Sequence, residues 1–311
     1  MSTAVLTLSP AEQAQLEKDR NKMGSTKVPQ IKQIRLSNKD MKQAPESHYF
    51  IELYKGKDIE PEIQVLGPTV DVVPVYQTSS YSYFTKADGL IAWTSDIHGY
   101  TPLDIVTLYV KRDGKVTIDF DGMYPDFKKF LAQKYTTVDP ITGKSKKLLT
   151  FKNILYVLFN GEIHKLFVSN TSNAGVTTEG YPNFESPEPG SLQLHLKKLW
   201  QGRQALYEYT IRLGSLLITS DATDKTERKK IAKVPKPYYI MTFDVVGENK
   251  ELSKAIVGKI GCEQSIQIID EMRKDEAQAG TAERQNVQLV PVDAIPPPQA
   301  EFESSDVDIF N

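Results

Sequence analysis

The chain has 311 residues, of which 40% are hydrophobic and 25% are charged, which is ordinary for a globular protein. No run approaches the roughly 20 apolar residues of a membrane-spanning helix, and the N-terminal residues do not resemble a secretory signal peptide. The single cysteine, Cys262, excludes an internal disulfide framework and fits a reducing compartment. We therefore expect a cytoplasmic protein without a membrane partner.

The first third of the chain is predicted to hold a polar arm followed by strands. Residues 1–26 form the arm, with a helix that begins at Ser9-Pro10, because serine caps a helix and proline suits its first turn. Extended segments with strand-like composition then follow within residues 30–36, 48–55, 69–77 and 89–97.

The middle of the chain carries two hairpin signals. Residues 104–120 are predicted to turn at Asp113-Gly114, and residues 149–169 at Asn160-Gly161, a pair that favours the tightest hairpin turns. Between the two hairpins, residues 124–135 have the apolar spacing of a short helix.

The last third is predicted to form a helix, two strands and a longer helix. Residues 190–202 place leucines on one helical face, residues 205–219 and 237–246 alternate between apolar and polar side chains, and residues 249–277 follow a helical pattern. Three strands, a helix and two strands is the order of the five-stranded OB barrel, although other α+β folds share it.

The predicted fold class is therefore α+β. Residues 27–278 form a β-rich body that contains an OB-like five-stranded barrel, with additional N-terminal strands and a C-terminal helix. Residues 279–302 are small, polar and proline-bearing, which predicts a flexible linker. Residues 303–311 are predicted to be a disordered acidic tail.

The charges are unevenly distributed. Five of the 40 acidic residues lie beyond Arg284, the last basic residue, so the preceding chain holds 38 basic and 35 acidic residues. A loop within 219–237 concentrates cations, as does a second cluster ahead of residue 153. Such clusters favour a polyanion such as the nucleic-acid backbone, although a solvated hairpin loop would have the same composition. The basic candidates are Lys144, Lys146, Lys147, Lys152, Lys225, Arg228, Lys229, Lys230 and Lys233.

Aromatic residues gather between residues 76 and 93 among small polar side chains. Exposed rings can stack on unpaired bases, and Tyr81, Tyr83 and Trp93 are the candidates for this role. The alternative is that these rings fill the core of a sheet, which we favour for most of them.

Motifs for catalysis and for cofactors are missing from the sequence. No Gly-x-Ser-x-Gly, His-Glu-x-x-His or zinc-finger spacing occurs. Asp119, Asp121 and Asp126 lack the later glutamate of a calcium loop. We therefore expect no enzyme activity, no cofactor and no metal.

The final residues, ESSDVDIFN, carry acids followed by an exposed apolar pair. With the preceding linker, they resemble the C-terminal end of bacterial-type single-stranded DNA-binding proteins, in which an OB domain and a linker precede a tip that ends Asp-Asp-Ile-Pro-Phe. This chain lacks the proline between Ile309 and Phe310, and Asn311 follows the phenylalanine. The resemblance implies that Asp306, Asp308, Ile309 and Phe310 dock onto partner proteins.

These patterns together predict a protein that coats single-stranded DNA during replication or recombination, as a phage-type or divergent bacterial-type member of that class. It would act in the nucleoid or in the cytoplasm of a phage-infected host, with an oligomeric state that the sequence leaves open. The alternative is a non-enzymatic structural or assembly protein, for example of a virion, with a C-terminal docking peptide.

Overall fold

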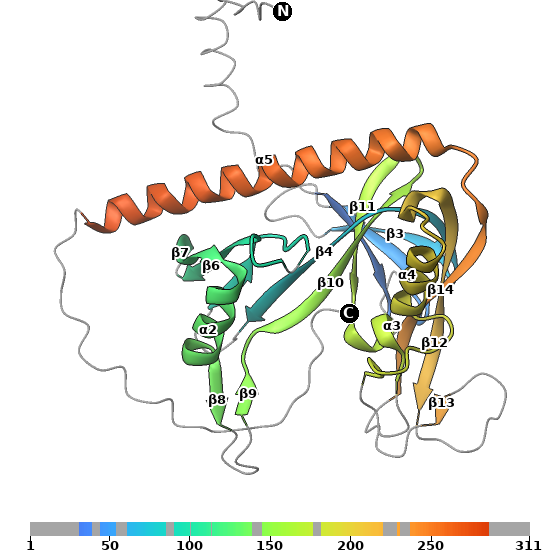
Figure 1. Ribbon diagram of the computed structural model, residues 1–311, viewed down its shortest axis with the longest axis horizontal. Helices are drawn as coiled ribbons and strands as arrows, with labels where there is room; N and C mark the ends of the chain where they lie inside the picture. Colours follow the sequence, from blue (N-terminus) through green and yellow to red (C-terminus); the bar gives the residue numbers. More distant parts are fainter. Residues whose placement is uncertain are drawn as a thin grey trace, which may run out of the picture. The chain divides into compact units, whose positions relative to one another are not determined.

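The structure, a computed structural model, describes residues 31–38, 44–53, 61–84, 90–99, 101–112, 114–138, 145–176, 182–219, 229–230 and 237–285 (Figure 1). The predicted N-terminal arm, the linker and the acidic tail lie outside these residues, apart from the last helical turns of residues 279–285. The described part is β-rich and ends in a long helix, as expected from the sequence.

Most strands belong to one sheet of twelve strands. Its main path runs in the order β3 (Glu62–Gly67), β2 (Tyr49–Leu53), β1 (Lys32–Leu36), β11 (Glu162–Val168), β10 (Thr150–Phe159), β4 (Val70–Phe84), β5 (Ile91–Thr94), β6 (Ile105–Arg112), β7 (Lys115–Met123). A branch leaves this path at β4 and consists of β12 (Tyr209–Thr219), β14 (Tyr238–Glu248) and the short β13 (Lys229–Lys230). A separate pair is formed by β8 (Thr136–Val138) and β9 (Ser145–Lys147).

The 15-residue strand β4 is the hub of this arrangement. It pairs antiparallel with β10 from Val73 to Ser82, with β5 from Ser82 to Phe84 and with β12 from Val70 to Val72. The two terminal strands of the main path, β3 and β7, are not paired with each other. The described strands therefore do not close into the expected five-stranded barrel, because the order of elements along a chain does not dictate which strands pair.

Both predicted hairpins of the middle region are confirmed. Asn160 and Gly161 have φ values of 50° and 79°, which is what a tight two-residue turn requires, and they join β10 to β11. Strands β6 and β7 pair as the other predicted hairpin.

The helices follow the predicted apolar spacing. Helix α2 (Tyr124–Lys134) buries Phe127 and Leu131, and α4 (Leu192–Gln201) buries Leu192 and Leu199. The sequence did not predict β3, β8, β9, β13 or the short helix α3 (Asn170–Ala174). The predicted alternation begins too early, because Tyr207 lies in a 3-10 turn, η1 (Leu206–Glu208), and Val245, which pairs with Ile211 on the predicted face, is 52% exposed.

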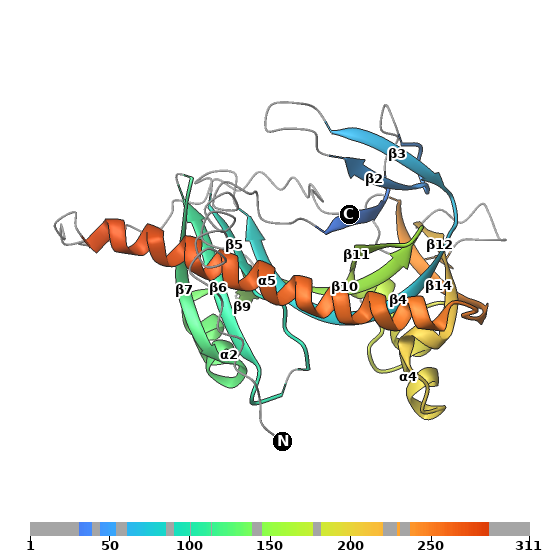
Figure 2. The ribbon, with the colours of Figure 1, turned by 90° about the horizontal axis from the view of Figure 1, so that it is seen from above.

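Helix α5 (Leu252–Gln285) runs across several strands of the sheet (Figure 2). It buries Ala255, Cys262 and Ile266 against Val75, Ile154 and Tyr156 of β4 and β10. A Cβ atom on Gly258 would lie 3.3 Å from Ile163 Cδ1, so glycine permits a close approach between α5 and β11. Cys262 is 1% exposed and serves as packing here.

The docking of α5 predicts different outcomes for two isoleucines. Ile266 is 4% exposed, whereas Ile268 is 50% exposed. Ile266→Ala should therefore lower the free energy of unfolding by about 2–4 kcal/mol, because it leaves a cavity under the helix, and Ile268→Ala should change it by less than about 0.5 kcal/mol. Urea denaturation at low protein concentration measures both values. Equal losses would contradict the orientation of α5.

Candidate nucleic-acid interface

Strands β1, β11, β10, β4 and β5 place a row of side chains on the face of the sheet that α5 partly covers. Residues paired directly across two strands lie on one face, as do residues two apart along a strand. Lys152 pairs with Ser80, and Ser82 pairs with Trp93. Phe167 pairs with Ile154, two residues from Lys152, so that it shares this face.

We call this row the α5-flanking strip, because it adjoins Ile154 and Tyr156, which pack under the helix on the same face. Gln33 of β1 pairs with Lys165 in parallel register, so the two residues share a face. Arg35 is two residues from Gln33 and therefore adds a cation on this face at one end of the row. The strip consists of Arg35, Lys165, Phe167, Lys152, Ser80, Ser82 and Trp93.

Phe167 is the aromatic centre of the cationic end of the strip. The Nζ atoms of Lys152 and Lys165 lie 5.2 Å and 5.3 Å from the centroid of its ring. Arg35 lies close enough to Lys152 to act on its charge, and its guanidinium donates to Glu52 at 2.7 Å. Two cations therefore lie against one half-buried ring, and the Arg35 guanidinium, which lies over the ring of Phe50 at 5.6 Å, is near Lys152.

At the cationic end of the strip, the surroundings disfavour the protonated forms of Lys152 and Lys165. Burial, followed by the positive charges of Arg35 and Lys165, lowers the pKa of Lys152 to about 8. Burial and then the charge of Arg273 also lower the pKa of Lys165, while Asp96 opposes that shift. Like charges held together in this way are stabilised by an anion that approaches them.

Trp93 lies at the other end of the strip, two strands from Lys152. Its ring stacks on that of Tyr109 with a centroid distance of 5.8 Å. The hydroxyl of Tyr109 donates to the backbone oxygen of Asp270 in α5, at 3.3 Å. One face of the indole is thus held by a ring that is itself fixed to the helix.

A polar network under α5 borders the strip. Asp96 accepts hydrogen bonds from the hydroxyls of Thr78 at 2.7 Å and Tyr156 at 2.6 Å. Burial and then the charge of Asp96 raise the pKa of Asp270 to about 7. Beyond this network α5 continues to β7, where Lys274 donates to Asp121 at 3.2 Å.

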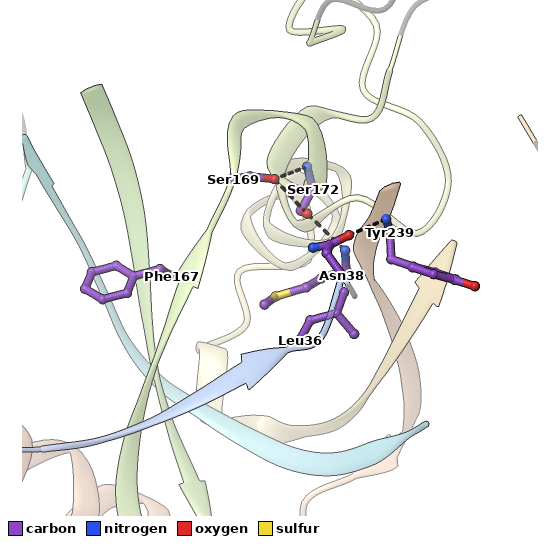
Figure 3. A pocket seen from close by; sticks show the side chains of 7 residues that line it. Leu36, Asn38, Phe167, Ser169, Ser172 and Tyr239 are labelled. Atoms are coloured by element: carbon purple, nitrogen blue, oxygen red, sulfur yellow. Dashed lines mark hydrogen bonds between the residues drawn. The ribbon is translucent and has the colours of Figure 1, made fainter. Parts of the chain in front are cut away.

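A small pocket lies beside Phe167 (Figure 3). Its polar groups bond to one another: Asn38 Oδ1 accepts from the Tyr239 amide at 2.5 Å, and the Ser172 hydroxyl accepts from the Met241 amide at 3.0 Å. The bond between Asn38 and Tyr239 links the end of β1 to β14. Because the polar groups of the pocket already have partners, the pocket is a weaker candidate for a ligand site.

The structure separates the candidates that were predicted from the sequence. Lys152 and Trp93 share the α5-flanking strip. Tyr81 and Tyr83 lie on the opposite face of β4, where Tyr81 packs edge-on against Phe127 and Phe151 at 5.5 Å and 5.1 Å between centroids. These two tyrosines contribute to the core that α2 covers, which is the alternative favoured for most of the rings.

The remaining basic candidates are not brought to the strip by the described residues. Lys147 is exposed in β9, and only the backbone of Lys146, Lys229 and Lys230 is described. Lys144, Lys225, Arg228 and Lys233 lie outside the described residues, as do Asp306, Asp308, Ile309 and Phe310.

Sequence reasoning missed Arg35, Lys165 and Phe167. The register of the Asn160-Gly161 hairpin carried a signal for two of them, because a two-residue turn places Ile154 opposite Phe167. The pairing of β1 with β11 joins residues about 130 positions apart, so no local pattern could have found Arg35.

The three aspartates that were considered for a metal site are engaged elsewhere. Asp119 accepts from Lys134 and Tyr135, Asp121 accepts from Thr107 and Lys274, and Asp126 accepts from Lys129. In the described part of the chain, no group of three or more His, Cys, Asp or Glu side chains is arranged to hold a metal ion. No helix among the described residues is long and apolar enough to cross a membrane.

Comparisons of the chain with family models, with curated proteins and with solved structures find no match. Any function must therefore be argued from the site itself.

The converging cations predict an unusual titration. The Lys152 ammonium should titrate near pH 8, well below the value of about 10.4 for a free lysine, and Lys165→Met should move that pKa upward because one repelling charge is lost. NMR of the lysine Cε–Hε groups measures both. A Lys152 that titrates near pH 10 in the unaltered protein would contradict the described packing.

Proposed function

We propose that the protein binds single-stranded DNA along the α5-flanking strip and acts in replication or recombination. The observation that carries the proposal is the placement of Lys152 and Lys165 against the ring of Phe167, with Arg35 near Lys152, on the same sheet face as Trp93. Cations neutralise phosphates and release their counterions, while rings stack on bases of any sequence.

A single strand suits this arrangement better than a duplex. Bases must be unpaired and splayed to reach a ring that lies flat in a sheet, and duplex readers present a helix or ribbon to a groove. The order of three strands, a helix and two strands is that of OB proteins, but the proposal requires only the open sheet face. The basic loop around Arg228 and the docking of partners by Asp306, Asp308, Ile309 and Phe310 remain part of the proposal.

Titration with oligo-dT tests the proposal. The chain has two tryptophans, and Trp200 is 80% exposed in α4, so Trp200→Phe leaves Trp93 as the reporter. We expect oligo-dT to quench this fluorescence at about 50 mM salt, and we expect the same length of duplex to have little effect.

Substitutions in the strip should then separate the two kinds of contact. Lys152→Gln should weaken binding and reduce the slope of log affinity against log salt by about 1, because one phosphate contact is lost. Phe167→Leu should cost about 1–3 kcal/mol of binding with the salt slope unchanged, because it removes stacking. Lys197→Gln on α4 is the matched control and should bind as the unaltered protein does.

The absence of quenching and of any mobility shift with single strands would refute the proposal. It would favour the alternative, a structural or assembly protein that uses its C-terminal residues for docking.

A further inference from the structure

The solvent-facing side of α5 carries few charges between Glu251 and Asp270. Between Glu251 and Asp270 the helix holds three charged residues, Lys254, Lys259 and Glu263. Lys259 and Glu263 pair with each other at 2.6 Å, and Lys259 lies over the ring of Tyr76 on the sheet. Lys254 pairs with Glu251 at 2.6 Å.

Aliphatic side chains occupy the outward positions instead. Their exposed fractions range from 40% to 70%, whereas Ala255, Cys262 and Ile266 of the same helix are buried. The exposed aliphatic residues are Leu252, Ile256, Val257, Ile260 and Ile268. The exposed side of a helix on a soluble domain normally carries charges, and a contiguous apolar patch marks a contact surface.

The charges at the two ends of this surface are complementary. Lys250 and Glu271 are both exposed, and neither has an ion-pair partner among the described residues. Lys250 lies two residues before α5 begins at Leu252, and Glu271 follows Ile260 by eleven residues, which is about 16 Å along the helix. The surface therefore has a cation at one end, an anion at the other and isoleucine at its midpoint.

We propose that α5 binds α5 of a second copy of this chain in antiparallel orientation, with the two-fold axis at Ile260. An isologous contact of this kind pairs residues whose numbers sum to about 520. It sets Ile260 against its own copy, Ile256 against Gln264 and Leu252 against Ile268. It also forms the Lys250–Glu271 ion pair twice. Leu252, Ile260 and Ile268 meet apolar partners in this register, and the charges at its two ends are complementary, which favours a second copy over an unrelated partner.

Sedimentation velocity on the full chain tests this proposal without nucleic acid, so that its outcome is independent of DNA binding. The short contact predicts a dimer that forms with a dissociation constant in the range of about 1–100 µM. Ile260→Lys should abolish the dimer. The far-UV circular dichroism spectrum should remain unchanged, because Ile266 still packs against the sheet.

Charge reversal identifies the antiparallel register. Lys250→Glu and Glu271→Lys should each raise the dimer dissociation constant about tenfold, because two like-charge contacts replace two ion pairs. The double variant should return it to within about threefold of the unaltered value, since each reversed charge again faces its opposite. Lys197→Glu on α4 is the control and should have no effect.

Disulfide trapping gives a second readout. Ile260→Cys should cross-link to its own copy on oxidation, whereas Ile256→Cys alone should not. A protein that stays monomeric at about 100 µM, a dimer that survives Ile260→Lys, or a double reversal that does not restore the dimer would each overturn the proposal. A monomer would mean that another occupant, such as residues 1–30 or a different protein, covers this surface.

Discussion

The pairing of β4 with three other strands is the constraint on which the rest of the structure depends. Strand β4 has fifteen residues and pairs with β10, β5 and β12. The main path of the sheet and its branch are therefore joined through this one strand. The register of β4 decides which side chains face α5 and which face α2. A slip of one residue would exchange those two sets.

Helix α5 then determines what the α5-facing side of the sheet can do. It buries Ile154 and Tyr156, passes the polar network around Asp96 and continues to β7, while Phe167 packs partly buried at the edge of its apolar core. Lys152 is the next residue on this face of β10, and Phe167 lies beside it on β11. The cost of holding Lys152 and Lys165 together appears as their lowered pKa values, and a bound phosphate would offset it.

Much of the local structure could be predicted from the sequence. The Asn160-Gly161 turn, the stripe of Phe127 and Leu131 in α2 and the long C-terminal helix all follow from local spacing and turn chemistry, and the structure confirms them. The sheet order could not be predicted, because the pairings of β1 with β11 and of β4 with β12 join distant residues. The functional candidates divide in the same way: Lys152 was found from charge clustering, whereas Arg35 is placed beside it only by a long-range pairing.

The register between β4 and β5 separates the aromatic residues. Trp93 and Tyr81 are close in sequence and equally aromatic, but Trp93 faces α5 while Tyr81 packs against Phe127 on the other side. Composition cannot distinguish the two, since the difference depends on the register between β4 and β5. An exposed ring and a core ring become distinguishable only once the faces of the sheet are known.

The claim that one sheet face binds the single strand is tested most directly by photo-cross-linking. An oligo-dT in which single thymidines are replaced by 5-iododeoxyuridine would be irradiated with the full chain, and the attached peptides would be identified by mass spectrometry. The account predicts cross-links at Phe167 and Trp93, and none at Tyr81 or Tyr83. Cross-links confined to Tyr81, Tyr83 or the basic loop around Arg228, with none at Phe167 or Trp93, would contradict it.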